Sequence, residues 1–317
     1  MRDCFGRTVT YLRLSVTELC NLRCRYCMPT EGVCKRRHDE MLTEEEMIMA
    51  VEVAQSLGIR KVRITGGEPL VKRNIVSICQ HVAAIRGIED VAITTNGLLL
   101  PQFAHPLKDA GVQRVNISLD TLDPEKYKYI TRIGELRDAL RGVKAALDTG
   151  FQKVKINVVL MKGFNDDEIE ALARLTRIHP VDVRFIEWMP MASIDDDDRS
   201  RHLPVSAVLE TLPSLSPQPH DGGVARLYRL PGALGNVGLI SPVSHHFCRA
   251  CNRLRLTADG KIKPCLHSPD EYAIKGLDRE RMREQFIRAI RAKPEQHAPL
   301  FADHRSEAHR AMYQIGG

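Results

Sequence analysis

Short runs rich in β-branched residues alternate with amphipathic stretches over the first 190 or so residues of the chain. The runs predict six strands, at residues 9–16, 61–65, 91–95, 112–118, 153–160 and 181–186. Helices are predicted after Thr43, which forms a capping box with Glu46, over 137–149 and after 165–167. Six βα units in succession predict a parallel sheet with helices on its outer face. Because a closed barrel of this type has eight units, we expect an α/β fold with a partial (βα)6 TIM-like barrel.

The alternation ends after Met189. The acidic run 195–198 predicts a solvated loop, and the prolines and glycines that follow predict irregular structure. Farther along, Asp259-Gly260 separates two strand-like runs, which is the pattern of a β-hairpin. A polar helix and a tail then complete the chain.

We therefore expect two parts. Residues 1–220 are predicted to form the barrel core, and residues 221–317 a C-terminal segment that closes the barrel mouth. Barrel enzymes place their reacting groups at the carboxyl ends of the strands, and we expect the same here. The tail ends in Gly316-Gly317, a pair that fits a narrow path into the barrel as well as a frayed end.

Composition narrows the class of protein. The chain has 317 residues, 43% of them hydrophobic and 27% charged, which is ordinary for a folded domain. Its net charge of +6 suits an anionic small molecule and is too small to indicate a nucleic-acid partner. No apolar run reaches the ~18 residues of a membrane span, and the N-terminus lacks an apolar signal core. Nine cysteines, an odd number, argue against a secreted disulfide framework. We expect a cytoplasmic protein.

Six of the cysteines form two triplets: Cys20, Cys24 and Cys27, and then Cys248, Cys251 and Cys265. Thiolates at such spacings bind soft metals or iron–sulfur clusters. A [4Fe–4S] cube has four irons to ligate, so three cysteines leave one iron open to a small molecule. In the second triplet His267 offers a fourth ligand, so a Cys3His zinc site remains an alternative there.

Cations interrupt four of the predicted strands: Arg13, Arg63, Lys155 and Arg184. A buried unpaired cation is costly, so each needs an anion or water. If the side chains point into the barrel together, they suit a triphosphate. Arg253 and Arg255 alternate on the hairpin strand, where they either join this anion site or lie on the surface. The chain has no phosphate-loop motif, so a nucleotide would be a substrate to be rearranged, not an energy source.

The first triplet, with Tyr26 before its last cysteine, resembles the cluster motif of the radical S-adenosylmethionine (SAM) superfamily. Gly66-Gly67-Glu68-Pro69, at the end of the second strand, resembles that superfamily's glycine-rich SAM-binding motif. The second triplet with its thirteen-residue gap, the residues 252–256 beside it and the terminal glycine pair are similar to the GTP 3′,8-cyclase (MoaA) family of molybdenum cofactor biosynthesis. Residues 94–97, 118–120 and 184–189 add to this similarity.

The resemblance implies a set of cofactors and site residues. Two [4Fe–4S] clusters would be held by the six triplet cysteines, and SAM would bind at the first. Contacts to SAM are implied for Tyr26, Gly67, Ser118 and Met189. Contacts to GTP are implied for Arg13, Arg63, Thr94, Lys155, Arg253 and Arg255. Direct roles in catalysis are implied for Arg13, Arg253, Arg255, Gly316 and Gly317.

The resemblance also implies a reaction and partners. A 5′-deoxyadenosyl radical would take hydrogen from C3′ of GTP, and C3′ would then attack C8 of guanine. The product, (8S)-3′,8-cyclo-7,8-dihydroguanosine 5′-triphosphate, would pass to cyclic pyranopterin monophosphate synthase. An external one-electron reductant and a homodimer are implied as well, with no nucleic acid and no membrane.

Two other functions stay open at this point. One is a radical SAM enzyme with an auxiliary cluster that acts on a peptide. The other is a zinc-bearing, mildly basic nucleic-acid-binding protein. Metal content separates them, because two four-iron clusters require about eight irons per chain, whereas the binding protein would hold zinc without iron.

Overall fold

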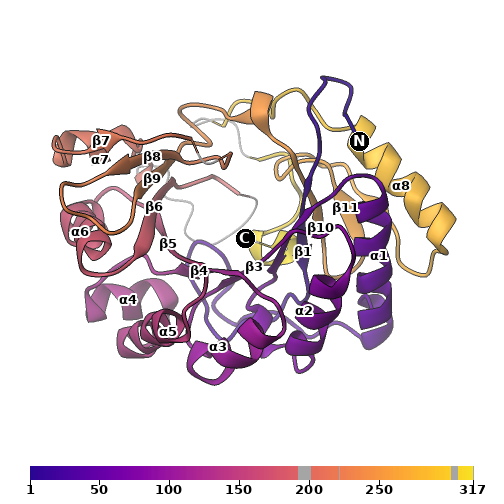
Figure 1. Cartoon of the computed structure of the whole chain (residues 1–317), viewed down its shortest axis with the longest axis horizontal. Helices are drawn as coiled ribbons and strands as arrows, with labels where there is room; N and C mark the ends of the chain where they lie inside the picture. The colour runs from indigo at the N-terminus through magenta and orange to yellow at the C-terminus, as the bar shows by residue number, and fades with distance from the viewer. Residues whose placement is uncertain (192–200, 221, 301–305, 317) are drawn as a thin grey trace.

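The computed structural model describes residues 1–191, 201–220, 222–300 and 306–316. The predicted acidic loop at 195–198 and Gly317 lie outside these residues. Figure 1 shows a curved sheet whose helices lie on its outer side, with the described C-terminal end inside the curve. The arrangement confirms the predicted partial barrel.

The strands of the described residues belong to one sheet, in the order β12-β11-β10-β1-β2-β3-β4-β5-β6-β9-β8-β7. The first six are β1 (Tyr11–Ser15), β2 (Lys61–Thr65), β3 (Asp90–Thr95), β4 (Arg114–Ser118), β5 (Lys153–Leu160) and β6 (Val181–Glu187). The later six are β7 (Ser216–Pro217), β8 (Arg226–Arg229), β9 (Val237–Ile240), β10 (Arg253–Leu256), β11 (Lys261–Lys263) and β12 (Tyr272–Ala273). The six predicted barrel strands are therefore confirmed to within a few residues at their ends.

The α-helices are α1 (Glu44–Ser56), α2 (Ile75–Ala84), α3 (Leu100–Asp109), α4 (Pro124–Thr131), α5 (Leu136–Thr149), α6 (Ile169–Ile178), α7 (Ser206–Thr211), α8 (Arg279–Arg291) and α9 (Met312–Ile315). Single 3-10 turns occupy His38–Glu40, Pro69–Val71, Asp166–Glu168 and Cys248–Ala250. The predicted capping box starts α1, because Thr43 and Glu46 each accept the other's backbone N–H. Helices α1 to α6 cover the outer face of the sheet, whereas α9 lies with the C-terminal end inside the curve (Figure 1).

The C-terminal segment adds a strand to each edge of the barrel. β9 pairs in parallel with β6, and β10 pairs in parallel with β1, so eight neighbouring strands run in the same direction. β10 and β11 form the predicted hairpin. Because β7 and β8 pair across residue 220, the proposed boundary falls within a small antiparallel extension of the same sheet. The division at that residue stays a prediction.

Strand register places the polar residues of several strands on the inner face. Arg13 is level with Arg63 on one side and with Arg255 on the other. Across the sheet, Asn157 is level with Ser118 and Arg184. Residues level with one another in parallel strands point to the same face. The register therefore gathers guanidinium, hydroxyl and amide groups around one interior space, as the interrupted strands predicted.

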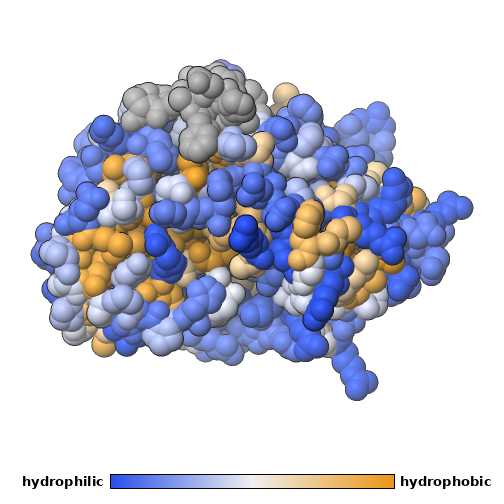
Figure 2. All heavy atoms as spheres, turned by 90° about the horizontal axis from the view of Figure 1, so that it is seen from above, coloured by the Kyte–Doolittle hydropathy of each residue, from blue (hydrophilic) through white to orange (hydrophobic). Residues whose placement is uncertain are grey.

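The alternate residues of the strands form the main core with the helices. Leu12, Leu14, Ile64 and Phe185 are fully buried there. Figure 2 shows polar residues over most of one face, with apolar residues visible between them. Among the described residues, no helix combines the length and apolar character needed to cross a bilayer.

Candidate active site

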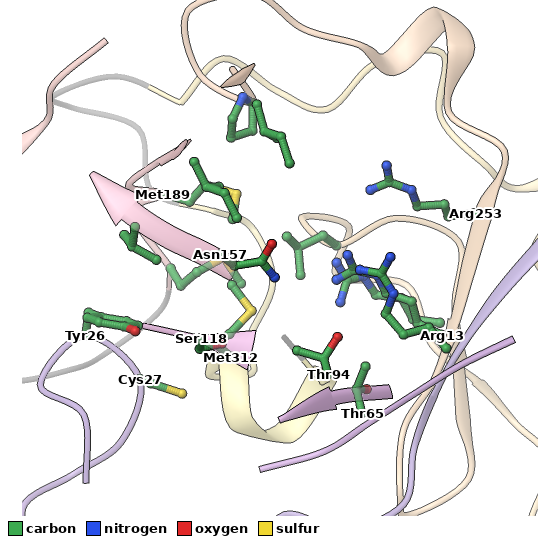
Figure 3. Close-up of a pocket in the computed structure, with 18 of the residues that line it drawn as sticks. Arg13, Tyr26, Cys27, Thr65, Thr94, Ser118, Asn157, Met189, Arg253 and Met312 are labelled. Carbon is green, nitrogen blue, oxygen red and sulfur yellow. The ribbon is translucent and has the colours of Figure 1, made fainter. Parts of the chain in front are cut away.

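A single cavity of about 310 Å³ reaches from one cysteine triplet to the other. All six triplet cysteines line it, and the structure describes each as a free thiol. Figure 3 shows Arg13 and Arg253 on one side of the cavity and Tyr26, Cys27 and Met189 on the other, with Asn157 and Met312 between them. The two triplets therefore face a common interior and not opposite outer surfaces.

The first triplet lies in the loop that leaves the carboxyl end of β1. The loop turns tightly, because the backbone N–H groups of Cys27 and Met28 both donate to the carbonyl of Cys24. The glycine motif after β2 packs directly on it: Gly67 donates to the carbonyl of Thr17 at 2.7 Å. A Cβ on Gly67 would lie 2.4 Å from a backbone oxygen of the loop, so only glycine permits this approach.

Burial controls the acidity of the first triplet. It raises the pKa of Cys20 to about 11 and that of Cys27 to about 12, and it raises the pKa of Cys24 well above the usual range. Neighbouring sulfurs and the Asp120 carboxylate act in the same direction on Cys24. The three thiols stay protonated near neutral pH unless a bound cation stabilises the thiolates.

Four residues that the resemblance assigns to SAM lie around this triplet. Tyr26, Gly67, Ser118 and Met189 all line the cavity. The Tyr26 hydroxyl donates to Asp120 at 2.6 Å, which fixes the ring. Asp120 in turn accepts from the backbone N–H of Val159 at 2.8 Å, and burial raises its pKa to about 6.

The second triplet lies at the opposite end of the strands. Cys248 and Cys251 precede β10, which runs parallel to β1, and Cys265 follows β11, which runs antiparallel to β10. All three are therefore at the amino ends of the barrel strands. The expectation that the reacting groups gather at the carboxyl ends holds for the first triplet and is wrong for the second. The reason is that β10 pairs in parallel with β1. The start of β10 and the end of β11, where the cysteines lie, are therefore both at the amino ends of the barrel strands.

Lys293 gives the second triplet a different electrostatic setting. Its ammonium group donates to the Cys251 sulfur at 3.4 Å and to the carbonyls of Arg253 and Pro264 at 3.0 Å each. Burial alone would raise the pKa of Cys251, but Lys293 and Arg253 outweigh it and lower the pKa. Burial keeps the pKa of Cys248 and of Cys265 raised.

Histidines adjoin the second triplet, which bears on the zinc alternative. His267 donates to or accepts from the Ser306 hydroxyl at 3.0 Å, and burial lowers its pKa to about 3. A different trio, His246, Cys248 and His297, has its ligand atoms within 4.8 Å of one another. The residues beside this triplet therefore include nitrogen ligands as well as sulfur.

Buried guanidinium groups connect the two triplets. Arg13, Arg63, Arg253 and Arg255 all line the cavity. Burial, with Arg255 and Arg63 close by, lowers the pKa of Arg13 well below its usual value, and burial lowers that of Arg255 to about 10. The buried Nε atoms of Arg13, Arg63 and Arg253 have no hydrogen-bond partner within the described part of the chain. Such a cluster is complementary to a polyanion.

The remaining predicted nucleotide residues differ in their placement. Thr94 lines the cavity, and its buried hydroxyl has no hydrogen-bond partner among the described residues. Lys155 and Arg184 are on the inner face but are not among the residues that line the cavity. The Lys155 ammonium lies 3.8 Å from the Asp182 carboxylate, an anion within the chain itself.

Gly316 lies inside the barrel. Its carbonyl accepts a hydrogen bond from the Arg255 guanidinium. Its φ is +85°, and a Cβ there would lie 2.3 Å from the Thr65 hydroxyl, so the position requires glycine. Of the two alternatives for the tail, entry into the lumen is confirmed for Gly316.

Sequence reasoning did not assign a role to several polar or flexible residues of the cavity. Among them are Asn157, Asp120, Lys293 and Met312. Asn157 has the clearest signal, since it falls on the inner face two positions after Lys155. Lys293 and Met312 come from segments without a strand or motif, so no pattern could place them in the cavity.

The fold and the three-cysteine loop together define the class of protein. The model of the Radical SAM superfamily matches residues 14–176, and that of Molybdenum Cofactor Synthesis C matches residues 181–299. The fold is similar to Streptococcus suis SuiB bound to S-adenosylmethionine (TM-score 0.60, 15% identity, 82% of this chain and 59% of that one). It is also similar to anSMEcpe with bound AdoMet (TM-score 0.59, 11% identity, 90% of this chain and 78% of that one). The chain is thus a radical SAM partial-barrel protein.

Curated relatives narrow the family. The chain is 49% identical to the GTP 3′,8-cyclase of Alkaliphilus oremlandii and 48% identical to that of Heliobacterium modesticaldum, each over 100% of both chains. It is 45% identical to the GTP 3′,8-cyclase of Moorella thermoacetica over the same extent. The chain belongs to the GTP 3′,8-cyclase family of molybdenum cofactor biosynthesis.

Proposed function

We propose that this chain converts GTP to (8S)-3′,8-cyclo-7,8-dihydroguanosine 5′-triphosphate with SAM as the co-substrate. The observation that carries the proposal is the shared cavity, in which two thiol triplets lie at opposite ends of a cluster of buried guanidinium groups. Family membership supports the reaction, and the arrangement supports the assignment of roles within this chain.

The donor sets fit two iron–sulfur clusters. Three sulfurs at each end leave one position of a four-iron cube for a ligand that is not protein. When bound, the first cluster would supply the electron that cleaves SAM, and the second would hold the guanine base. Cys20, Cys24 and Cys27 would ligate the first cluster, and Cys248, Cys251 and Cys265 the second.

The chain's own residues would orient SAM near the first triplet. Tyr26, Ser118 and Met189 line the cavity there, and the tight approach of Gly67 leaves backbone groups available to a ligand. The Tyr26 ring is held by Asp120, so its position is fixed before SAM arrives. Fixed groups of this kind reduce the entropy that binding must overcome.

The arginines would hold the triphosphate. Arg13, Arg63 and Arg253 have buried donors whose bonds a phosphate oxygen would satisfy, and Thr94 has a buried hydroxyl nearby. Arg255 would link the nucleotide to the tail through the carbonyl of Gly316. Lys155, which lies 3.8 Å from Asp182, would add positive charge to the inner face beside the cavity. Direct catalytic roles fall to Arg13, Arg253, Arg255, Gly316 and Gly317.

The proposal extends to partners. An external one-electron reductant would serve the first triplet, the product would pass to cyclic pyranopterin monophosphate synthase, and the chain would act as a homodimer in the cytoplasm. These proposals are supported by the resemblance to the family. Size-exclusion chromatography with light scattering measures the oligomeric state directly.

The test is an anaerobic incubation of the reconstituted protein with SAM, GTP and dithionite. We expect 5′-deoxyadenosine and a cyclised GTP in equal amounts, from protein that holds about eight irons. Cleavage of SAM without a change in GTP would refute the proposal, and modification of a peptide in the same mixture would favour the peptide-acting alternative. Zinc bound near stoichiometry in place of iron would refute both.

A further inference from the structure

The C-terminal tail is held to the barrel by an arginine that the proposed reaction does not use. Arg310 lies six residues before Gly316 and forms hydrogen bonds with two carboxylates at once. Its guanidinium donates to Asp259 at 2.8 and 3.1 Å, and to Glu271 at 2.5 and 2.8 Å. Each carboxylate is engaged by two nitrogens, which is the geometry that arginine alone provides.

This contact is well shielded from water. The side chain of Arg310 is 14% exposed, that of Asp259 7% and that of Glu271 24%. Burial acts to lower the pKa of Arg310, but the hydrogen bonds with Glu271 and Asp259 outweigh it and raise the pKa above its usual value. Loss of one partner from such a group leaves the others buried without compensation, so the contact is costly to break.

Other charged groups face the same site and cannot replace Arg310. Arg36 lies 3.5 Å from Asp259 and donates to Glu18 at 2.9 Å, and Lys263 lies 3.5 Å from Glu271. Glu18 is a longer 3.9 Å from Arg310 itself. Neither Arg36 nor Lys263 belongs to the tail. Arg310 is therefore the cation, among the described residues, that ties the tail to these carboxylates.

Beyond Arg310 the tail enters the cavity and reaches the first triplet. Met312 lines the cavity, and Ile315 packs in a buried cluster with Met191 and Ala308. The backbone N–H of Tyr313 lies beside the Cys27 sulfur, where it acts to lower the pKa of that thiol against the effect of burial. Hydrogen bonds to the sulfurs of a cluster stabilise its reduced, more negative state and raise its reduction potential.

We propose that Arg310 is a positioning residue that docks the C-terminal tail in the barrel, and that the docked tail sets the reduction potential of the first cluster through Tyr313 and Cys27. Electron transfer to that cluster is then easiest when the tail is in place. Since Gly316 contacts Arg255 in the same docked state, the device links generation of the oxidant to a completed substrate site. The statement about potential rests on the proposed function, whereas the docking contact does not.

Docking is tested on the protein without metals by hydrogen exchange of the peptide that covers residues 306–316. We expect Arg310→Ala to speed exchange there by ~10-fold or more, with a smaller effect for Arg310→Lys, which keeps the charge and loses the fork. Arg279→Ala is the matched control, because Arg279 pairs with Glu52 on the outer surface of α8 and α1. Unchanged exchange in Arg310→Ala would overturn the docking role.

The effect on potential is tested in a chain whose second triplet is replaced by serines, so that one cluster remains. Redox titration followed by electron paramagnetic resonance should give a more negative midpoint potential for Arg310→Ala than for the parent, and partial recovery for Arg310→Lys. An equal potential in a variant whose tail exchanges rapidly would overturn the link to Cys27. Failure of the parent to assemble any cluster would instead count against the proposed function, and the exchange experiment would still decide the docking role.

Discussion

The two cysteine triplets are alike in composition and differ in their surroundings. The first is buried with Asp120 nearby, and the pKa of each of its thiols is raised, although Arg23 acts in the opposite direction on Cys20. The second lies next to Lys293 and Arg253, and the pKa of Cys251 is lowered. Two sets of three thiols with the same ligand chemistry can thus differ in how readily they lose their protons, because the fold gives them different neighbours.

The two triplets differ in what stabilises their thiolates. In the second triplet the Cys251 thiolate is favoured by Lys293 and Arg253, so part of the negative charge of a cluster is offset before it binds. Those of the first depend on the bound metal itself for that compensation. The acidic surroundings of the first triplet also disfavour an extra electron, so an N–H donor such as that of Tyr313 matters more there.

The largest expected effect separates the triplets by function. Cys24→Ala should abolish 5′-deoxyadenosine formation, because it removes a ligand of the site assigned to SAM. Cys251→Ala should abolish cyclised GTP while SAM cleavage continues within a factor of ~10 of the parent, since the first site is intact. Chromatographic measurement of both products, with iron counted in each variant, checks this. Loss of SAM cleavage in both variants would mean that the triplets do not act separately.

The next effect concerns the guanidinium cluster between the triplets. Arg13→Met should lower kcat/KM for GTP by about 10²–10³-fold, because charge-assisted hydrogen bonds to phosphate are lost. The same substitution should raise the melting temperature of the ligand-free protein, since it removes a buried charge repelled by Arg255 and Arg63. Arg60→Ala, which breaks a surface pair with Glu89, is the control for both measurements. A destabilised Arg13→Met protein would contradict the proposed repulsion.

Sequence patterns predicted the barrel well because its signals are local. Each of the first six strands is a short β-branched run bounded by turns, and the capping box at Thr43 marks a helix start without any tertiary information. The hairpin at Asp259-Gly260 was equally local. What pattern could not supply was the partner of that hairpin, since nothing in the residues of β10 says that it will pair with β1.

Residues of the candidate site could be predicted where their spacing along the sequence reflects their function. Both triplets and the cations of the strands could be named from the sequence, and the structure brings the triplets, Arg13, Arg63, Arg253 and Arg255 to one cavity. The end of the barrel at which the second triplet lies depends on the pairing of β10, so it was predicted wrongly. Lys293 was out of reach for a different reason: it follows a surface helix and meets Cys251 only through the tertiary fold.

A smaller effect tests the electrostatic difference directly. In protein without metals, Lys293→Met should slow alkylation of Cys251 near neutral pH by ~10-fold, because the thiolate fraction falls when the neighbouring cation is removed. In the parent, Cys251 should react at lower pH than Cys27, whose pKa is raised to about 12. Mass spectrometry of the alkylated peptides over a pH series measures both rates. Equal pH profiles for Cys251 in parent and variant would remove the basis of the comparison.

The smallest effect lies within the first triplet's surroundings. Tyr26→Phe keeps the aromatic ring and removes the hydroxyl that donates to Asp120. A hydrogen bond to a charged group contributes ~1.5–3 kcal/mol, but water admitted with the ligand replaces part of it, so KM for SAM should rise only ~3–10-fold. Tyr129→Phe, on an exposed ring of α4, should leave KM unchanged. If Tyr26→Phe abolished 5′-deoxyadenosine formation as Cys24→Ala does, Tyr26 would take part in the chemistry itself. The first triplet would then depend on its polar neighbours as strongly as the second depends on Lys293.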